Sequence, residues 1–163
     1  MSERDEFEGL GIPADCHPKI GEAVAYWLSI KPDGGLPGRQ HFDPTDIPRL
    51  LRGVWLIDVQ RDPLSFVFRL VGTGVVEFFG ADPTGENLND VFEDFPETVA
   101  CKDFRQVVET GAPSWRRGTP QLRHESKFSR LERVYLPLAR NGKEVDLIFC
   151  LSVFDKTGNG GGR

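Results

Sequence analysis

The segment of residues 66–80, FVFRLVGTGVVEFFG, constrains the fold of this chain more than any other part of the sequence. Its apolar residues first follow a period of two and then crowd into a short helical run that stops at Gly80. This pattern predicts a strand that passes through a tight turn into a helix of one or two turns. Such a turn is typical of nucleotide-binding enzymes, and it also begins some small sensory domains.

The glycines of this turn do not complete a nucleotide-binding motif. A dinucleotide fingerprint needs Gly-x-Gly-x-x-Gly, and Glu77 stands where the third glycine should follow Gly72 and Gly74. The carboxylate of Glu77 would also compete with a phosphate for the same backbone amides. A helix that stops at Gly80 is shorter than the roughly ten residues that a parallel crossover requires. The sequence therefore favours a sensory domain.

Three short motifs, in this order along the chain, resemble a PAS-related family of small bacterial proteins. They are Leu-Pro-Gly-Arg-Gln-His-Phe-Asp-Pro-Thr-Asp-Ile at 36–47, Arg-Leu-Val-Gly-Thr at 69–73 and Phe-Gly-Ala-Asp-Pro-Thr-Gly at 79–85. The resemblance is close over residues 36–85 and looser as far as Phe154. It implies an α+β fold with a PAS-like five-stranded antiparallel sheet, helices packed on one face, a cavity between them, and an N-terminal helical extension. PAS domains are sensory modules that usually bind a small ligand, a cofactor or another protein domain.

Length and composition fit one globular domain. The chain has 163 residues, of which 39% are hydrophobic and 28% charged. A net charge of -5 argues against a nucleic-acid partner, because phosphate binding requires a basic surface. No apolar run approaches about 18 residues and no signal-peptide pattern opens the chain, so we expect a cytoplasmic protein without a membrane partner. Cys16, Cys101 and Cys150 are odd in number and far apart, so no disulfide framework is indicated.

The hydrophobic pattern divides the chain into four parts. We expect a mobile N-terminal tail at 1–15, an N-terminal helix and connecting loop at 16–53, the PAS-like domain at 54–154 and a flexible, glycine-rich tail at 155–163. The predicted strands of the domain are 54–59, 66–71, 112–118, 128–139 and 144–154, with helices at 75–79, 87–92 and 97–110. Asn141-Gly142 predicts a two-residue type I′ hairpin between the last two strands.

Strict alternation assigns the strand residues to two faces of the sheet. In the first hairpin, one face is predicted to carry Val54, Leu56, Phe66, Phe68 and Leu70. The opposite face is predicted to carry Trp55, Ile57, Val67, Arg69 and Val71. In the last strand, Phe149 and Leu151 belong to one apolar face, which we expect to turn toward the interior.

The strongest candidate for a functional site is an apolar cavity beneath the helices. The residues expected to surround it and contact a small apolar ligand are Phe68, Leu70, Val75, Phe78, Phe79, Leu88, Phe92, Phe104, Val108, Tyr135, Phe149 and Leu151. The alternative is that these side chains fill the interior completely, as core side chains normally do. The 12 phenylalanines of the chain suit either interpretation.

The sequence identifies neither a catalytic group nor a cofactor. No Gly-x-Ser-x-Gly elbow, metal-ligand spacing such as His-x-x-x-His, or Asn-Cys-Arg stretch of a LOV-type flavin site is present. The helix at 97–110 lacks the histidine that a PAS haem site would place there. We therefore expect no enzyme and no metal, with a small enzyme using the same pocket as the alternative from another functional class.

The N-terminal helix suggests an interaction surface. Large apolar groups on it and a matching patch on the sheet form the predicted interface, which consists of Tyr26, Trp27, Ile30, Trp55, Ile57 and Val67. The sequence favours a homodimer through this surface over packing within one chain. We thus expect a free-standing sensory or interaction module that signals through dimer contacts or a partner protein, or else a ligand-free structural adaptor.

Overall fold

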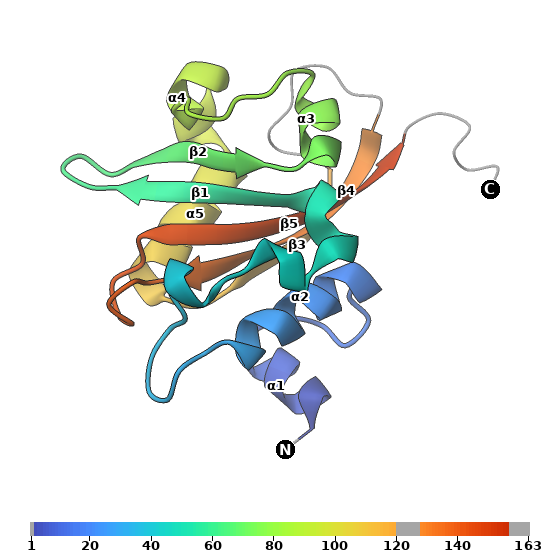
Figure 1. Cartoon of the computed structure of the whole chain (residues 1–163). Helices are drawn as coiled ribbons and strands as arrows, with labels where there is room; N and C mark the ends of the chain where they lie inside the picture. Colours follow the sequence, from blue (N-terminus) through green and yellow to red (C-terminus); the bar gives the residue numbers. More distant parts are fainter. Residues whose placement is uncertain (1, 120–127, 157–163) are drawn as a thin grey trace.

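The computed structural model of the chain describes residues 2–119 and 128–156 and contains an antiparallel sheet of five strands (Figure 1). The strands are β1 (Val54–Gln60), β2 (Ser65–Val71), β3 (Ser114–Gly118), β4 (Phe128–Leu138) and β5 (Leu147–Lys156). Their spatial order is β2-β1-β5-β4-β3, so the last strand of the chain lies in the middle of the sheet. The predicted α+β fold with a five-stranded antiparallel sheet is confirmed.

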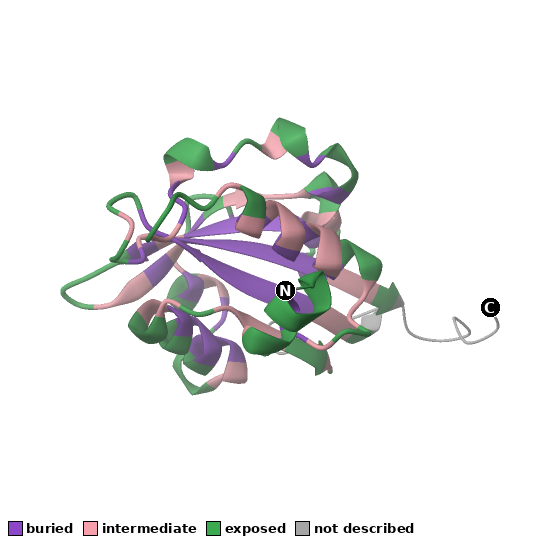
Figure 2. Cartoon of the chain, turned by 90° about the horizontal axis from the view of Figure 1, so that it is seen from below, coloured by how far each residue is buried: buried purple, intermediate pink, exposed green. Residues whose placement is uncertain are grey.

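Helices cover both faces of this sheet. On one face lie α3 (Thr73–Phe79), α4 (Leu88–Val91), the 3₁₀ turn η4 (Phe95–Glu97) and α5 (Val99–Thr110). On the other lie α1 (Glu3–Gly9), α2 (Pro18–Ser29) and the 3₁₀ turns η1 (Arg39–His41), η2 (Pro44–Asp46) and η3 (Pro48–Gly53). Figure 2 shows the buried strands enclosed between these two layers. No helix in the described residues is long and apolar enough to pass through a bilayer.

Helix α5 is fixed at both ends by its own sequence. The Thr98 hydroxyl accepts a hydrogen bond from the Cys101 amide at 3.0 Å, which caps the first turn. Gly111 ends the helix in the left-handed region, with φ of 68°. Ala100, Phe104 and Val107 are buried at helical spacing. The buried face therefore orients α5 over the sheet.

Helix α2 packs on the opposite face of the sheet within the same chain. Pro18 occupies its first turn, and the His17 Nδ1 atom accepts a hydrogen bond from the Lys19 amide at 3.0 Å. Trp27 is 1% exposed, and its indole N–H donates to the Pro137 carbonyl of β4 at 2.8 Å. A tryptophan buries its polar N–H only when a partner accepts it, so this bond sets the position of the helix.

A short helix precedes α2 in the region predicted as a tail. Ser2 and Asp5 form a reciprocal capping box at the start of α1. Phe7 and Ile12 are buried in the same cluster as α2. The tail was predicted from the acidic composition of residues 1–15, which gave no weight to these two apolar residues. Most of the tail predicted at 155–163 lies outside the described residues.

The predicted assignment of strand residues to faces was wrong in part. Trp55 and Ile57 face α3 and α5, whereas Val54 and Leu56 face α2. Since apolar residues line both faces of β1, alternation alone does not say which face meets which layer. A register shift adds a second error, because Leu56 pairs with Leu70 and Ile57 with Phe68, which leaves Arg69 as a bulge residue. The bulge moves Leu70 to the opposite face from Phe68.

The turn between β4 and β5 is longer than the predicted two-residue hairpin. Leu138 pairs with Leu147, so residues 139–146 form the connection. A type I′ turn requires positive φ at both central residues, but Asn141 is not among the described non-glycine residues with positive φ. Its side chain instead accepts hydrogen bonds from the amides of Lys143 and Glu144, at 3.0 and 2.8 Å.

Among the described glycines, Gly72 makes the closest approach to a neighbouring backbone. A Cβ atom at this position would lie 2.2 Å from the Leu51 carbonyl oxygen and 2.8 Å from that of Val54. Its φ of -67° is open to any residue, so glycine is needed here for space and not for a special backbone conformation. The absence of a side chain brings the start of α3 against η3 and β1.

Candidate functional site

A pocket lies between the inner face of the sheet and the helices α3 and α5. Its apolar walls are Trp55, Val75, Phe78, Phe79 and Phe154. The centre of a water molecule can move within about 30 Å³ of it. One water needs roughly 10–15 Å³ by this measure, so the pocket holds about two. The interior is therefore mostly filled by side chains, with a small free volume at one end.

Arg133 lines the polar end of this pocket and forms a buried ion pair with Asp103, which does not itself line the pocket. Asp103 of α5 accepts a hydrogen bond from the Nη2 atom of Arg133 on β4. The Nη1 atom of Arg133 donates to the Ser114 carbonyl at 3.0 Å and to the Ser114 hydroxyl at 3.1 Å. Both members of the ion pair are almost fully buried. Buried charges persist only when paired in this way, and this pair joins α5, β3 and β4.

Arg116 of β3 is the second cation at the pocket. Its Nε atom lies 3.0 Å from Asp103 Oδ2 and its Nη2 atom lies 3.3 Å from Oδ1. With 44% of its side chain exposed, Arg116 stands at the solvent side of the pocket. The polar end thus presents two guanidinium groups, both of which bind the carboxylate of Asp103, a residue outside the lining.

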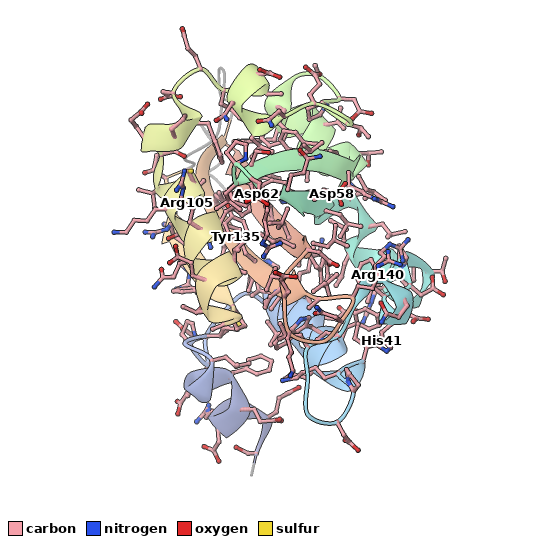
Figure 3. All side chains as sticks on the ribbon, turned by 90° about the vertical axis from the view of Figure 1, so that its left-hand side faces the viewer. His41, Asp58, Asp62, Arg105, Tyr135 and Arg140 are labelled. Atoms are coloured by element: carbon pink, nitrogen blue, oxygen red, sulfur yellow. The ribbon has the colours of Figure 1, made fainter. Side chains whose placement is uncertain are left out.

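Tyr135 of β4 forms the floor between the apolar and polar parts. Its ring stacks on Phe104 of α5 with centroids 4.3 Å apart, and the Arg133 guanidinium lies 3.8 Å from the ring centroid. Figure 3 shows Tyr135 between α5 and the sheet. Burial raises the pKa of the Tyr135 hydroxyl far above its ordinary value, so it stays protonated at neutral pH.

The Trp55 indole lines the pocket from β1. Its N–H donates to the Ser152 hydroxyl of β5 at 2.9 Å, and Ser152 also lines the pocket. The indole contacts the rings of Phe68, Phe79 and Tyr135, each at a centroid distance of 6.0 Å. The Trp55 side chain therefore connects the aromatic core to the polar part of the pocket.

Glu132, the neighbour of Arg133 on β4, points to the other layer. Its carboxylate accepts hydrogen bonds from the His17 amide and the Trp115 indole N–H, both at 2.9 Å. It also accepts from Arg117 Nε at 3.2 Å. His17 is the N-cap of α2, so Glu132 holds the start of that helix. Consecutive residues of β4 thus bind the two layers on opposite faces.

The structure places the predicted ligand-contacting residues in three groups. The four that line the pocket are Val75, Phe78, Phe79 and Tyr135. Those packed in the same core without lining it are Phe68, Leu88, Phe92, Phe104 and, partly buried, Val108. Those on the opposite face, packed with α2, are Leu70, Phe149 and Leu151. Their placement in the interior beneath α5 was wrong, because both faces of β5 are apolar and the bulge redirects Leu70.

The predicted interface residues do not form one surface. Trp55 and Ile57 are buried beneath α3 and α5, on the opposite face from α2. Trp27 is buried on the sheet by its own chain, and Tyr26 and Ile30 pack partly against the same cluster. Val67 is half-buried and forms an isolated bridge with Asn87. The outer face of the sheet is therefore covered within the chain, as the alternative interpretation expected.

Sequence reasoning missed the charged residues of the site. Asp103 stands on the apolar face of α5, one turn from Ala100 and Val107, and Arg133 shares one face of β4 with Leu131 and Tyr135. A charge at a position whose periodicity predicts burial was the signal for both residues.

The chemistry that this arrangement offers is recognition. Within residues 2–119 and 128–156, no three side chains of histidine, cysteine, aspartate or glutamate gather as a metal site. The pocket instead presents aromatic walls, the hydroxyls of Thr119, Tyr135 and Ser152, and two cations, which suits a small ligand with one polar end.

Comparisons with known proteins bear on the whole fold. The profile of the PAS domain family matches residues 16–152. Among solved structures, the chain is similar to a fungal LOV domain photoreceptor, with a TM-score of 0.47 and 12% identity over 82% of this chain and 90% of that one. It is also similar to an RNA-binding light-oxygen-voltage receptor, with a TM-score of 0.45 and 13% identity over 78% of this chain and 38% of that one. No curated protein matches the chain.

Proposed function

The chain belongs to the PAS domain family, and on this premise we propose that it is a sensory or interaction module that binds a small ligand in the pocket beneath α3 and α5. The observation that carries the proposal is the polar end of that pocket. Arg133 and Asp103 lie buried beside apolar walls, and Arg116 stands at the entrance. Ligand sites typically combine apolar walls with a few fixed polar groups.

The lining of the pocket supports a binding role over a catalytic one. None of its described lining residues is a histidine, cysteine, aspartate or glutamate. Tyr135, its titratable hydroxyl, has a pKa raised far above neutral by burial. An enzyme of general acid–base type needs groups that exchange protons near the working pH. The pocket favours holding a ligand over transforming it.

Strand β4 offers a route from the pocket to the opposite layer. Arg133 contacts the pocket, and the adjacent Glu132 holds His17 at the start of α2. A ligand that binds one arrangement of Arg133 better than another shifts the population of both layers. We therefore place the output on α2 and its neighbours, where a signalling partner protein would read it.

A ligand-free adaptor is the second candidate, and the dense interior favours it. The Trp55 ring contacts the rings of Phe68, Phe79 and Phe104, and the Phe68 ring also contacts that of Phe79. The free volume is about 30 Å³. An adaptor of this kind needs no ligand to be stable. It predicts that no metabolite raises the melting temperature.

Native mass spectrometry of the protein, followed by thermal-shift screening of small metabolites, tests these alternatives. We expect a retained or added small mass that raises the melting temperature. Ala100→Val should abolish this effect, because Ala100 lines the pocket and the added methyl groups occupy its free volume. Val107→Ile is the matched control, since Val107 lies on the same buried face of α5 but outside the pocket. The absence of any bound mass and of any thermal shift would favour the adaptor.

A further inference from the structure

We propose that the pocket binds a short-chain carboxylate through the guanidinium group of Arg116. This inference rests on the proposed ligand-binding function and specifies the chemistry of the ligand. Three properties of the site carry it: the charge balance at the polar end, the free hydrogen-bonding edge of Arg116, and the volume beside the aromatic walls.

The polar end carries an excess of positive charge. Arg116 and Arg133 both contact Asp103, whose two carboxylate oxygens are engaged by them. Two cations and one anion leave one positive charge, and none of the described residues that line the pocket is acidic. Glu132 faces the other layer and binds Arg117. A ligand anion beside Arg116 would offset this positive charge at the solvent side of the pocket.

Arg116 has the geometry to hold that anion. It uses its Nε and Nη2 atoms for Asp103. Its Nη1 amino group has no hydrogen bond to a residue that the structure describes, and 44% of the side chain is exposed. A planar guanidinium matches the planar carboxylate group through parallel N–H bonds. The same side chain can therefore bind Asp103 with one edge and a ligand with the other.

The remaining space limits the ligand to a short chain. The pocket holds about two water molecules in its 30 Å³ of free space. Phe78, Phe79 and Phe154 border this space and present apolar surface. With the carboxylate at the exposed Arg116, an alkyl part of roughly one or two carbons occupies the space of about two waters, whereas an aromatic ring exceeds it.

An NMR titration with acetate, propionate and butyrate tests the proposal. The Trp55 indole N–H is the reporter, because its acceptor Ser152 also lines the pocket. The Trp27 indole, bonded to Pro137 on the opposite face, is an internal reference. We expect a saturable shift of the Trp55 signal with at least one of these acids, while the Trp27 signal stays fixed.

Variants and ligand analogues define the outcomes. We expect Arg116→Gln to weaken carboxylate binding at least tenfold and Arg116→Lys to weaken it less, whereas Arg105→Gln, an exposed change on α5 outside the pocket, leaves it unchanged. Propionamide, which has the shape of propionate without its charge, should not bind. If Arg116→Gln does not fold, the comparison of propionamide with propionate and the Arg116→Lys variant still test whether the Arg116 charge binds the carboxylate.

Three results would overturn the proposal. They are equal binding of propionamide and propionate, full binding by Arg116→Gln, and tighter binding of inorganic phosphate than of any carboxylate. If no carboxylate shifts the Trp55 signal while native mass spectrometry retains an uncharged ligand, this inference fails and the proposed function stands. If neither experiment detects a ligand, both fail together.

Discussion

Arg133 of β4 and Asp103 of α5 form an ion pair with only 3% and 6% of their side chains exposed. The two residues are 30 positions apart in the sequence and join the helical layer to the sheet. A buried pair of this kind adds little net stability compared with apolar residues. Removal of one partner is strongly destabilising, because the other charge stays buried without a partner. The pair therefore determines how the chain responds to substitution at the pocket.

Replacement of Asp103 by asparagine should strongly destabilise the fold. The change leaves Arg133 buried without a counter-charge, so we expect a loss of about 3–5 kcal/mol in the free energy of unfolding, measured with urea. Asp58→Asn is the control, because Asp58 pairs with Arg69 at 3.4 Å on the surface and such pairs contribute below about 1 kcal/mol. Equal losses in the two variants would contradict the structural role of the buried pair.

Replacement of Trp27 by alanine should destabilise the protein by about 3–5 kcal/mol, because it opens a cavity between α2 and the sheet. Since the Trp27 contact lies within one chain, the melting temperatures of the parent protein and of the Trp27→Ala variant should not depend on protein concentration. Lys31→Ala is a mild control, as Lys31 lies 5.1 Å above the Trp27 ring at an exposed position. A concentration-dependent melting temperature would instead support dimerisation through this surface.

Gly72→Ala should be more damaging than Gly74→Ala. The added methyl group meets the Leu51 carbonyl oxygen at 2.2 Å in the first variant and the Arg52 carbonyl oxygen at 2.9 Å in the second. Overpacking against backbone costs about 1–3 kcal/mol or more, and chemical denaturation measures the difference. Gly9→Ala, at a site with nothing within 4 Å, should leave stability nearly unchanged. A reversed order would show that α3 does not approach η3 this closely.

The native cysteines should resist alkylation. Burial raises the pKa of Cys16 above 9.0, and the nearby charge of Glu132 raises it further. Because the thiolate is the reactive form, the midpoint of the Cys16 alkylation rate against pH should lie above 9.0. Burial raises the pKa of Cys150 well above 9.0, so Cys150 should react only after unfolding. Mass spectrometry of iodoacetamide-treated protein measures both sites separately.

Glu132→Gln sharpens this test. Loss of the carboxylate removes a charge that disfavours the Cys16 thiolate, so the pKa of Cys16 and the alkylation midpoint should fall. Asp15 has a weaker effect of the same sign, so Asp15→Asn should produce a smaller shift. A midpoint that rises in either variant would contradict the stated cause of the pKa shift.

The elements of this fold were readable from local sequence patterns. Helix α5 follows from Thr98, Gly111 and the spacing between them, and α2 follows from Pro18 and its apolar face. The sequence did not predict which helices cover which face of the sheet, because apolar residues cover both faces of β1 and β5. Alternation predicts which residues of a strand share a face, but it does not predict which helical layer that face contacts.

The candidate site was harder to predict than the fold. Its apolar walls at Val75, Phe78 and Phe79 followed from the short helix after the tight turn. Its charged end did not, because the partnership of Asp103 with Arg133 depends on how α5 lies across β4. A charged residue at a buried position indicates that a partner exists, but only the tertiary structure identifies that partner.

Glu132 and Arg133 are adjacent in the sequence, and each is hydrogen-bonded to a different helical layer. Glu132 binds the start of α2, and Arg133 binds α5. Rotation or sliding of this part of β4 must therefore strain both attachments at once. The two layers are mechanically coupled at this point, so damage on the α2 side should loosen the pocket even though no residue of α2 lines it.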